Sequence, residues 1–344
     1  MIKAGIIGAS GYAGCEVLRF LLNHPEAEVT AISAHSDKGK KVSDIYPSLY
    51  QVCDMTLLED DEVIDLCDVV FGGLPAGVSE DYAQKCMDKG VKFIDLGADF
   101  RLDSEDAYKQ WYGLSYKNPE LHKKQVYGLP EAHREDIKQA SLIGNPGCYP
   151  TSVNLGLMPV LKNHFQTSNK IIVNSASGVT GAGKKLTEDT HFPKTNESFH
   201  PYKTANHRHT PEIEQELSKM AGEDIHVTFV PHLLPVNRGI VSTMYVSVKD
   251  DLTLEDIYNA YTDMYKDETF VRVLPLGANA DLKFVQYTNF CNISLAMDER
   301  DHTLVVVSTI DNMVKGTAGQ AIQNMNLMFG LDETTGLTYV GPSF

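Results

Sequence analysis

The hydrophobic pattern of the first 145 residues alternates between short apolar runs and stretches with helical spacing. Apolar runs at 3–7, 28–34, 68–71, 91–96 and 141–143 predict buried strands. Between them, segments 15–23 and 78–89 repeat apolar residues at helical spacing and predict helices. Strands that alternate with helices in this way indicate a parallel sheet with right-handed crossovers, which is an α/β fold of the Rossmann type.

The pattern changes after residue 148. Longer strands are predicted at 170–176, 225–230, 240–248, 292–297 and 303–310, with helices at 151–165, 211–220, 254–265 and 321–329. Runs of this kind predict an α+β domain with a largely antiparallel sheet. We therefore expect residues 1–147 and 312–344 to form a dinucleotide-binding domain, to which the C-terminal helix returns. Residues 148–311 are expected to form a catalytic, substrate-binding and oligomerisation domain.

Composition and charge exclude several classes of protein. The chain has 344 residues, 42% of them apolar, and contains no run that approaches the ~20 apolar residues of a membrane span. Its N-terminus has the pattern of a strand and not of a signal peptide. Six cysteines without a C-x-x-C pair argue against a zinc site and against a disulfide framework, so we expect a reducing cytoplasm. The net charge of −16 disfavours nucleic acid and anionic membranes as partners.

A glycine-rich loop follows the first predicted strand and precedes the first predicted helix. Glycine at 8, 11 and 14 would let the backbone approach a pyrophosphate, which then lies at the helix N-terminus. A tight turn without a ligand is the alternative. The expected dinucleotide contacts are Gly8, Ser10, Gly11, Tyr12, Ala13 and Gly14.

The end of the second predicted strand indicates which dinucleotide binds. The residues there are Ser33, His35, Ser36 and Lys38, and hydroxyl and basic groups suit a 2′-phosphate, so NADP(H) is favoured. Asp37 would favour NAD if it turned inward. Leu74 and Pro75, in the loop after strand 68–71, are expected to line the same crevice.

Residues 144–151 (Gly-Asn-Pro-Gly-Cys-Tyr-Pro-Thr) connect a strand to a helix, with Pro150 at the expected first helical position. Cys148 would then face unpaired N–H groups and the positive end of the helix dipole, which favour the nucleophilic thiolate. The alternative is a buried structural cysteine.

Other polar residues could complete a reactive site. His207 and His209 flank an arginine before a predicted helix, for which Thr210 is the expected N-cap, and they are candidates for a general acid or base. A metal site is a weaker reading of this pair because no third ligand is in view. Arg101 lies just past a strand end and could hold a carboxylate or phosphate, or simply pair with a neighbouring aspartate.

With these residues assembled, the chain resembles the N-acetyl-gamma-glutamyl-phosphate reductase family of arginine biosynthesis. The matching stretches are 8–14, 95–102, 127–131, 144–151, 177–183, 207–213, 231–240 and 311–316. The Cys148 octet and the sequence His-Arg-His-Thr-Pro-Glu-Ile at 207–213 are the most specific of them.

The resemblance implies NADPH-dependent reduction of an acyl phosphate through a Cys148 thioester, in a homodimer or homotetramer. His209 is expected to be the acid/base, His207 the reserve candidate, and Glu212 the residue that orients or polarises it. Arg101, Asn145, Ser177, Thr180 and Arg238 are the expected substrate contacts. Ser177, Gly178, Asn312 and Lys315 are expected near the cofactor.

Two rivals remain at this point. Aspartate-semialdehyde dehydrogenase shares the architecture and the thioester chemistry on a substrate one carbon shorter, and the 207–213 stretch weighs against it. A non-catalytic NADP sensor is the alternative of another class, although a sensor needs no nucleophile.

Overall fold

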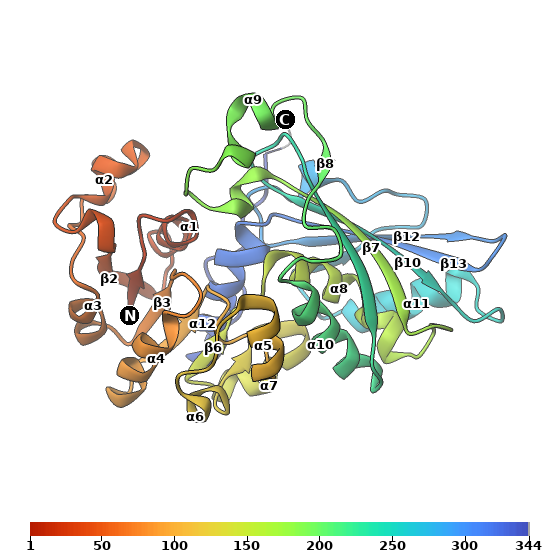
Figure 1. Ribbon diagram of the computed structural model, residues 1–344, viewed down its shortest axis with the longest axis horizontal. Helices are drawn as coiled ribbons and strands as arrows, with labels where there is room; N and C mark the ends of the chain where they lie inside the picture. The colour runs from red at the N-terminus through yellow and green to blue at the C-terminus, as the bar shows by residue number, and fades with distance from the viewer. Residues whose placement is uncertain (343–344) are drawn as a thin grey trace. The chain divides into compact units, whose positions relative to one another are not determined.

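The computed structural model describes residues 1–342 and divides into two compact units (Figure 1). One unit comprises Met1–Pro146 and Thr317–Thr338, and the other comprises Gly147–Gly316 and residues 339–342. The chain therefore enters the second unit one residue before Cys148. It leaves that unit through a π-helix, Val314–Ala318.

The first unit is built on a parallel sheet in the order β2-β1-β3-β4-β6-β5. Its central strand β3 is buried along its whole length, as expected for a sheet with helices on both faces. The parallel order confirms the predicted Rossmann-type class. The strands are β1 (Ile2–Ile7), β2 (Ala27–Ser33), β3 (Val69–Gly72), β4 (Lys92–Asp95), β5 (Val126–Tyr127) and β6 (Leu142–Gly144).

Helices connect these strands, and the C-terminal helix α12 packs against α1 and α7 within the same unit. Residues 102–140, where the pattern predicted no element, contain α5, α6, β5 and α7. The helices are α1 (Tyr12–Leu21), α2 (Val42–Ile45), α3 (Asp60–Leu66), α4 (Ser79–Asp88), α5 (Glu105–Tyr112), α6 (Pro119–His122), α7 (Pro130–Gln139) and α12 (Gly319–Met328).

The second unit contains a mixed sheet in the order β11-β12-β13-β10-β7-β9-β8. Strand β7 pairs in parallel with β9 and β11 with β12, while the other pairs are antiparallel. The β7–β9 pair is parallel because α10 crosses over between the two strands. The strands are β7 (Lys170–Ser177), β8 (His200–Pro201), β9 (His226–Leu233), β10 (Ile240–Ser247), β11 (Val271–Val273), β12 (Cys291–Asp298) and β13 (Thr303–Ile310).

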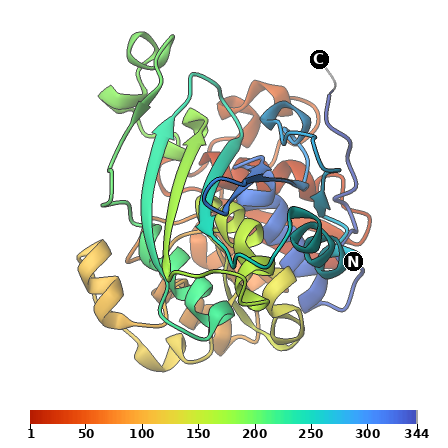
Figure 2. The same ribbon diagram turned by 90° about the vertical axis from the view of Figure 1, so that its right-hand side faces the viewer.

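Three helices cover one face of this sheet: α8 (Cys148–Lys162), α10 (Thr210–Ala221) and α11 (Leu254–Tyr265) (Figure 1). The alternate residues of β7, β9, β10 and β13 point to the opposite face and are half-buried or exposed, with Ile172 51% exposed. A short helix, α9 (Phe192–Thr195), lies in the green segment that stands out from the rest of this unit in Figure 2.

Candidate active site

Cys148 is the first residue of α8, and Gly147 is the N-cap. The first helical hydrogen bond runs from the Thr151 amide to the Gly147 carbonyl at 3.0 Å, so the helix begins two residues before Pro150, the predicted first position. Pro150 consequently occupies the third helical position instead of the first. The earlier start brings the half-exposed thiol of Cys148 into the first turn, where amide N–H groups and the helix dipole favour a thiolate.

The imidazole of His209 lies directly against Gly147, the residue before Cys148. A Cβ atom on Gly147 would stand only 2.6 Å from His209 Nε2, so any larger residue at 147 would displace the ring. His209 is itself the N-cap of α10, a position that the sequence had assigned to Thr210. Since α8 and α10 pack together, Cys148 and His209 both lie at the start of helices that meet at Gly147.

Glu212 binds the same glycine from the first turn of α10. Its side chain is fully buried, and Oε1 accepts a hydrogen bond from the Gly147 amide at 2.7 Å. Charge-assisted bonds of this kind are stronger than neutral ones. Glu212 thus contacts the backbone of the cysteine loop, whereas the sequence predicted that it orients or polarises histidine.

The two histidines occupy different environments. His207 is buried among aromatic rings, including Tyr149, Tyr202 and Phe229, and its Nδ1 accepts a hydrogen bond from the His209 amide at 3.1 Å. Burial lowers the pKa of His207 to about 4, and the positive charges of Lys203 and Arg208 act in the same direction. A neutral ring that holds the His209 backbone fits a positioning role for His207.

Acidification is expected to destabilise the protein through His207. Its pKa is lower in the folded protein than the ordinary value of 6.5, so the unfolded chain binds more protons between pH 6.5 and about 4. Stability from this group is thus present above pH 6.5 and lost as the pH falls, by about 3 kcal/mol in total. Urea unfolding from pH 7 to 5 should show a steeper loss in the wild-type protein than in His207→Asn. If the free energy of unfolding fell equally steeply with pH in the two proteins, the lowered pKa of His207 would be contradicted.

Two tyrosines that the sequence did not select lie beside the cysteine. The hydroxyls of Tyr149 and Tyr202 are 3.0 Å apart and form a hydrogen bond. Burial raises the pKa of both, to about 12 for Tyr202, and the Cys148 sulfur adds to the increase in each case. Both hydroxyls therefore remain protonated at neutral pH and form a polar edge to the site. Tyr149 could have been found from its position next to the cysteine.

The Arg101 side chain is buried and cross-links two strand ends. Nε donates to the Asn145 carbonyl at 2.8 Å and an Nη donates to the Leu96 carbonyl at 3.0 Å. These contacts fix the guanidinium group within the first unit. The Asn145 amide is also used within the fold, because Nδ2 donates to the Thr317 carbonyl at 3.0 Å and Oδ1 accepts from Asn324 at 3.1 Å. This use favours a structural role for the Asn145 side chain over the expected substrate contact.

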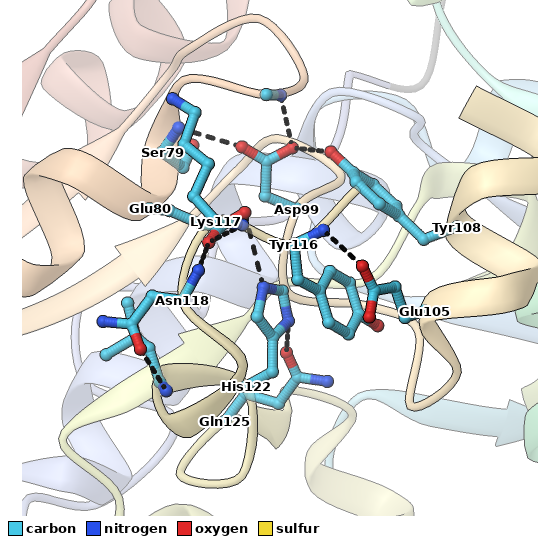
Figure 3. A network of polar contacts seen from close by, with 12 residues as sticks. Ser79, Glu80, Asp99, Glu105, Tyr108, Tyr116, Lys117, Asn118, His122 and Gln125 are labelled. Atoms are coloured by element: carbon cyan, nitrogen blue, oxygen red, sulfur yellow. Dashed lines mark hydrogen bonds and ion pairs between the residues drawn. The ribbon is translucent and has the colours of Figure 1, made fainter. Parts of the chain in front are cut away.

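The carboxylates near Arg101 hold neighbouring loops in place. Asp99 accepts hydrogen bonds from the Gly77 amide at 2.7 Å, the Ser79 amide at 2.9 Å and the Tyr108 hydroxyl at 2.6 Å (Figure 3). Burial, together with the charge of Asp99, raises the pKa of Asp95 to about 6. The acidic residues of this stretch thus anchor the start of α4 and the loop that contains Leu74 and Pro75.

The glycine loop fits a dinucleotide. A Cβ atom on Gly8 would lie 2.4 Å from the Gly73 carbonyl oxygen, and one on Gly14 would lie 2.4 Å from the Gly8 carbonyl oxygen. Only glycine fits this close packing of backbone, and α1 begins at Tyr12 with its N-terminus toward the loop. This arrangement of strand, bare backbone and helix start is suited to a pyrophosphate. Ser10 is buried in the loop, while Gly11 and Ala13 are half-buried.

The residues at the end of β2 differ in how they could reach a cofactor. Ser33 is fully buried, and its hydroxyl donates to Asp60 at 2.5 Å, so its side chain points into the fold. This orientation favours a structural role for the Ser33 side chain. His35, Ser36 and Lys38 are exposed, with Lys38 in an ion pair with Glu59.

The other predicted contacts lie in the second unit. Thr180 Oγ1 donates to the Asn237 carbonyl at 2.6 Å and accepts from Asn312 Nδ2 at 3.0 Å, while Asn312 Oδ1 accepts from the Gly239 amide at 2.7 Å. Asn312 therefore ties together the loops of Ser177–Gly178 and Arg238–Gly239. Lys315 is wholly buried, with its ammonium group 5.7 Å from the Phe270 ring.

Arg238 has a partly exposed guanidinium group in the second unit. It lies over the Tyr287 ring at 5.0 Å and 3.6 Å from Asp311 Oδ2, and its side chain is 18% exposed. Asp311 is fully buried and also accepts from the Tyr287 amide at 2.7 Å. The carboxylate and the ring together fix the position of the arginine.

Neither a metal centre nor a membrane span is found in the described part of the chain. Across residues 1–342, no group of three or more His, Cys, Asp or Glu side chains could hold a metal ion. Over the same range, none of the helices combines the length and apolar character of a membrane span.

Comparisons with known proteins agree with this architecture. Residues 3–140 match the semialdehyde dehydrogenase NAD binding domain, and residues 148–312 match the semialdehyde dehydrogenase dimerisation domain. Among solved structures, aspartate semialdehyde dehydrogenase II of Vibrio cholerae superimposes with a TM-score of 0.73 at 16% identity, over 96% of this chain and 98% of that one. The Candida albicans aspartate semialdehyde dehydrogenase with NADP gives 0.72 at 17% identity, over 96% of this chain and 98% of that one. The two domain matches, which agree with the fold, show that the chain belongs to the semialdehyde dehydrogenase class.

Relatives with much higher sequence identity show which family within this class the chain belongs to. The chain is 54% identical to N-acetyl-gamma-glutamyl-phosphate reductase of Brachyspira hyodysenteriae and 53% identical to that of Clostridium beijerinckii, over 100% of each chain in both cases. The chain belongs to the N-acetyl-gamma-glutamyl-phosphate reductase family, as the sequence motifs predicted.

Proposed function

We propose that this protein reduces N-acetyl-L-glutamyl 5-phosphate to N-acetyl-L-glutamate 5-semialdehyde and phosphate, with NADPH as reductant, in arginine biosynthesis. The observation that supports it best is the placement of Cys148 in the first turn of α8 with the His209 ring against Gly147. A nucleophile beside an acid/base at a helix N-terminus suits covalent acyl transfer.

The first step is acyl transfer to Cys148. The thiolate sulfur forms a bond to the acyl carbon, the bond from that carbon to the phosphate oxygen breaks, and the departing phosphate takes up a proton. The product is a thioester, which keeps the acyl group electrophilic after phosphate has gone. The negative charge that develops on the acyl oxygen is stabilised by amide N–H groups of the first turn of α8. Glu212 contributes by fixing the Gly147 amide, which sets the direction of that turn.

The second step releases the aldehyde. NADPH held at the glycine loop would supply a hydride for the thioester carbon. His209 donates a proton to the acyl oxygen and takes it back when the carbon–sulfur bond breaks, which regenerates the Cys148 thiolate. His207 supports this step by holding the His209 amide, which fixes the backbone from which the ring extends.

Anion binding is assigned to two arginines. We propose that Arg101 and Arg238 hold the substrate carboxylate and phosphate, and that Ser177 and Thr180 are further substrate contacts. The fixed guanidinium groups support this role, since a positioned arginine binds such anions in bidentate fashion. Gly178, Asn312 and Lys315 are assigned to the cofactor side, where Asn312 acts by holding the loops together.

The cofactor is NADP(H), and the glycine loop with residues 35–40 is proposed to hold it. The proposed assembly is a homodimer or homotetramer in which the exposed face of the second unit's sheet forms the subunit contact. Ile172, at 51% exposed, supports this because it is a large apolar side chain on that face. The proposed location is the cytoplasm.

One assay tests the substrate assignment. In the reverse direction, with phosphate and NADP, the protein should oxidise N-acetylglutamate semialdehyde and form NADPH, and aspartate semialdehyde should give at least a hundredfold lower kcat/KM. Rejection of the amine-bearing substrate follows because its charge and length differ from those of the acetylated one. Preference for aspartate semialdehyde would establish the rival enzyme. Turnover of neither aldehyde, despite NADP binding, would instead favour a sensor.

A further inference from the structure

An anion already occupies the place where the ribose of the dinucleotide is normally recognised. Asp37 follows β2 in a short 3₁₀ turn (His35–Asp37), and its side chain is 17% exposed. Its Oδ1 accepts from Lys40 Nζ at 2.9 Å and its Oδ2 accepts from the Ser36 hydroxyl at 3.0 Å. The Lys40 ammonium, with the Ser36 and Ser10 hydroxyls, lowers the pKa of Asp37, so the group is a carboxylate at neutral pH.

The three donors come from two segments of the nucleotide-binding unit. Ser10 belongs to the glycine loop, where the Tyr46 hydroxyl fixes its carbonyl at 2.9 Å, while Ser36 and Lys40 follow β2. Two hydroxyls and an ammonium group thus point at one carboxylate, which is the geometry of an anion-binding site. The anion in this site is the side chain of Asp37 itself. Lys38 is not part of it, because it pairs with Glu59.

A carboxylate at this position has two opposite effects on dinucleotides. It can accept a hydrogen bond from the ribose 2′-hydroxyl of NADH, and it repels the 2′-phosphate of NADPH. The same donors that hold the carboxylate would serve a phosphate better, because a phosphate offers three acceptor oxygens and a larger charge. Asp37 and a 2′-phosphate therefore compete for one set of donors.

We propose that Asp37 is a built-in competitor of the 2′-phosphate: it holds Ser10, Ser36 and Lys40 in an anion-binding arrangement and is displaced from them when NADP(H) binds. The inference rests on the proposed function only in taking NADP(H) as the cofactor. It makes Lys40 the principal cation for the 2′-phosphate and Asp37 the residue that limits the preference over NADH.

The test measures nucleotide binding without turnover. Calorimetric titration of the full-length protein with adenosine 2′,5′-bisphosphate should show roughly tenfold tighter binding by Asp37→Asn and roughly tenfold weaker binding by Lys40→Ala, while binding of 5′-AMP stays within about twofold. NADH binding should move the other way, weakening several-fold in Asp37→Asn. The gain for the bisphosphate should shrink with added salt, because the repulsion is between charges near the surface.

Two matched variants control for net charge. Asp65 and Lys89 form an exposed ion pair in the same unit, so Asp65→Asn and Lys89→Ala make the same charge changes away from β2. Neither should alter bisphosphate binding by more than about twofold. Unchanged or weaker bisphosphate binding by Asp37→Asn, or parallel changes for NADPH and NADH, would overturn the proposal.

The outcome separates this inference from the proposed function. If wild-type protein binds the bisphosphate far better than 5′-AMP and turns over substrate, but Asp37→Asn behaves like Asp65→Asn, only the role of Asp37 fails. If the wild-type protein shows no preference for a 2′-phosphate at all, the assignment of NADP(H) fails with it.

Discussion

Replacement of Cys148 by serine is expected to abolish reduction, with a loss of at least roughly 10⁴-fold in kcat, while NADPH still binds. A serine hydroxyl fits the space of the thiol but is not ionised at neutral pH, even at the positive end of α8. Binding should survive because the glycine loop belongs to the first unit and Cys148 to the second. The measurements are steady-state turnover and fluorescence titration with NADPH.

Cys291→Ser is the matched control for this variant. It makes the same change of sulfur to oxygen at a buried position whose neighbour, the Ser308 hydroxyl at 3.3 Å, can bond to the new hydroxyl. Turnover by Cys291→Ser should stay close to that of the wild-type protein. Iodoacetamide should inactivate the wild-type enzyme and fail to label position 148 in Cys148→Ser. Normal turnover by Cys148→Ser would exclude the thioester mechanism.

The second large effect concerns His209. His209→Asn is expected to lower kcat by roughly 10²–10⁴-fold, because asparagine can donate a hydrogen bond but cannot exchange a proton with the acyl oxygen. The pH–rate profile of this variant should also lose the limb that reports the acid/base. Substrate KM should change little, since the ring acts on the reacting atoms and not on the anionic groups.

His207→Asn is the internal comparison. The His207 ring is neutral and accepts a hydrogen bond from the His209 amide. Its loss should therefore lower kcat by less than about tenfold at pH 7 and leave the acid/base limb of the pH–rate profile in place. The two variants together decide between the histidines. If His207→Asn is the more severe of the two in kcat and loses the pH limb, the roles assigned to His207 and His209 must be exchanged.

Much of the local architecture could be predicted from the sequence. The strand, glycine loop and helix at 2–21 follow from periodicity and from glycine positions. The turn from β6 into a helix at Cys148 follows from the glycine and proline positions there. Helix starts were less accurate. α8 begins at Cys148 and not at Pro150, and α10 is capped by His209 and not by Thr210, because helix ends depend on hydrogen bonds that a window of sequence does not contain.

Side-chain direction was the main property that the sequence could not supply. Ser33 and Asn145 have suitable chemistry and lie at strand ends, yet both point into the fold, toward Asp60 and toward Thr317 and Asn324. Their partners are distant in the chain, and only packing brings them together. The same is true of Glu212, which bonds an amide 65 residues away.

The sequence by itself determined the fold class, the family and the preference for NADP(H), and it marked Cys148 as the proposed nucleophile, because each depends on local residue types and their spacing. Tertiary structure decided how deeply His207 is buried, what Glu212 holds, and where the Asp37 carboxylate lies. These properties depend on burial and on contacts between segments far apart in the chain. Desolvation and charge–charge interactions act through space, so they are settled only when the chain has folded.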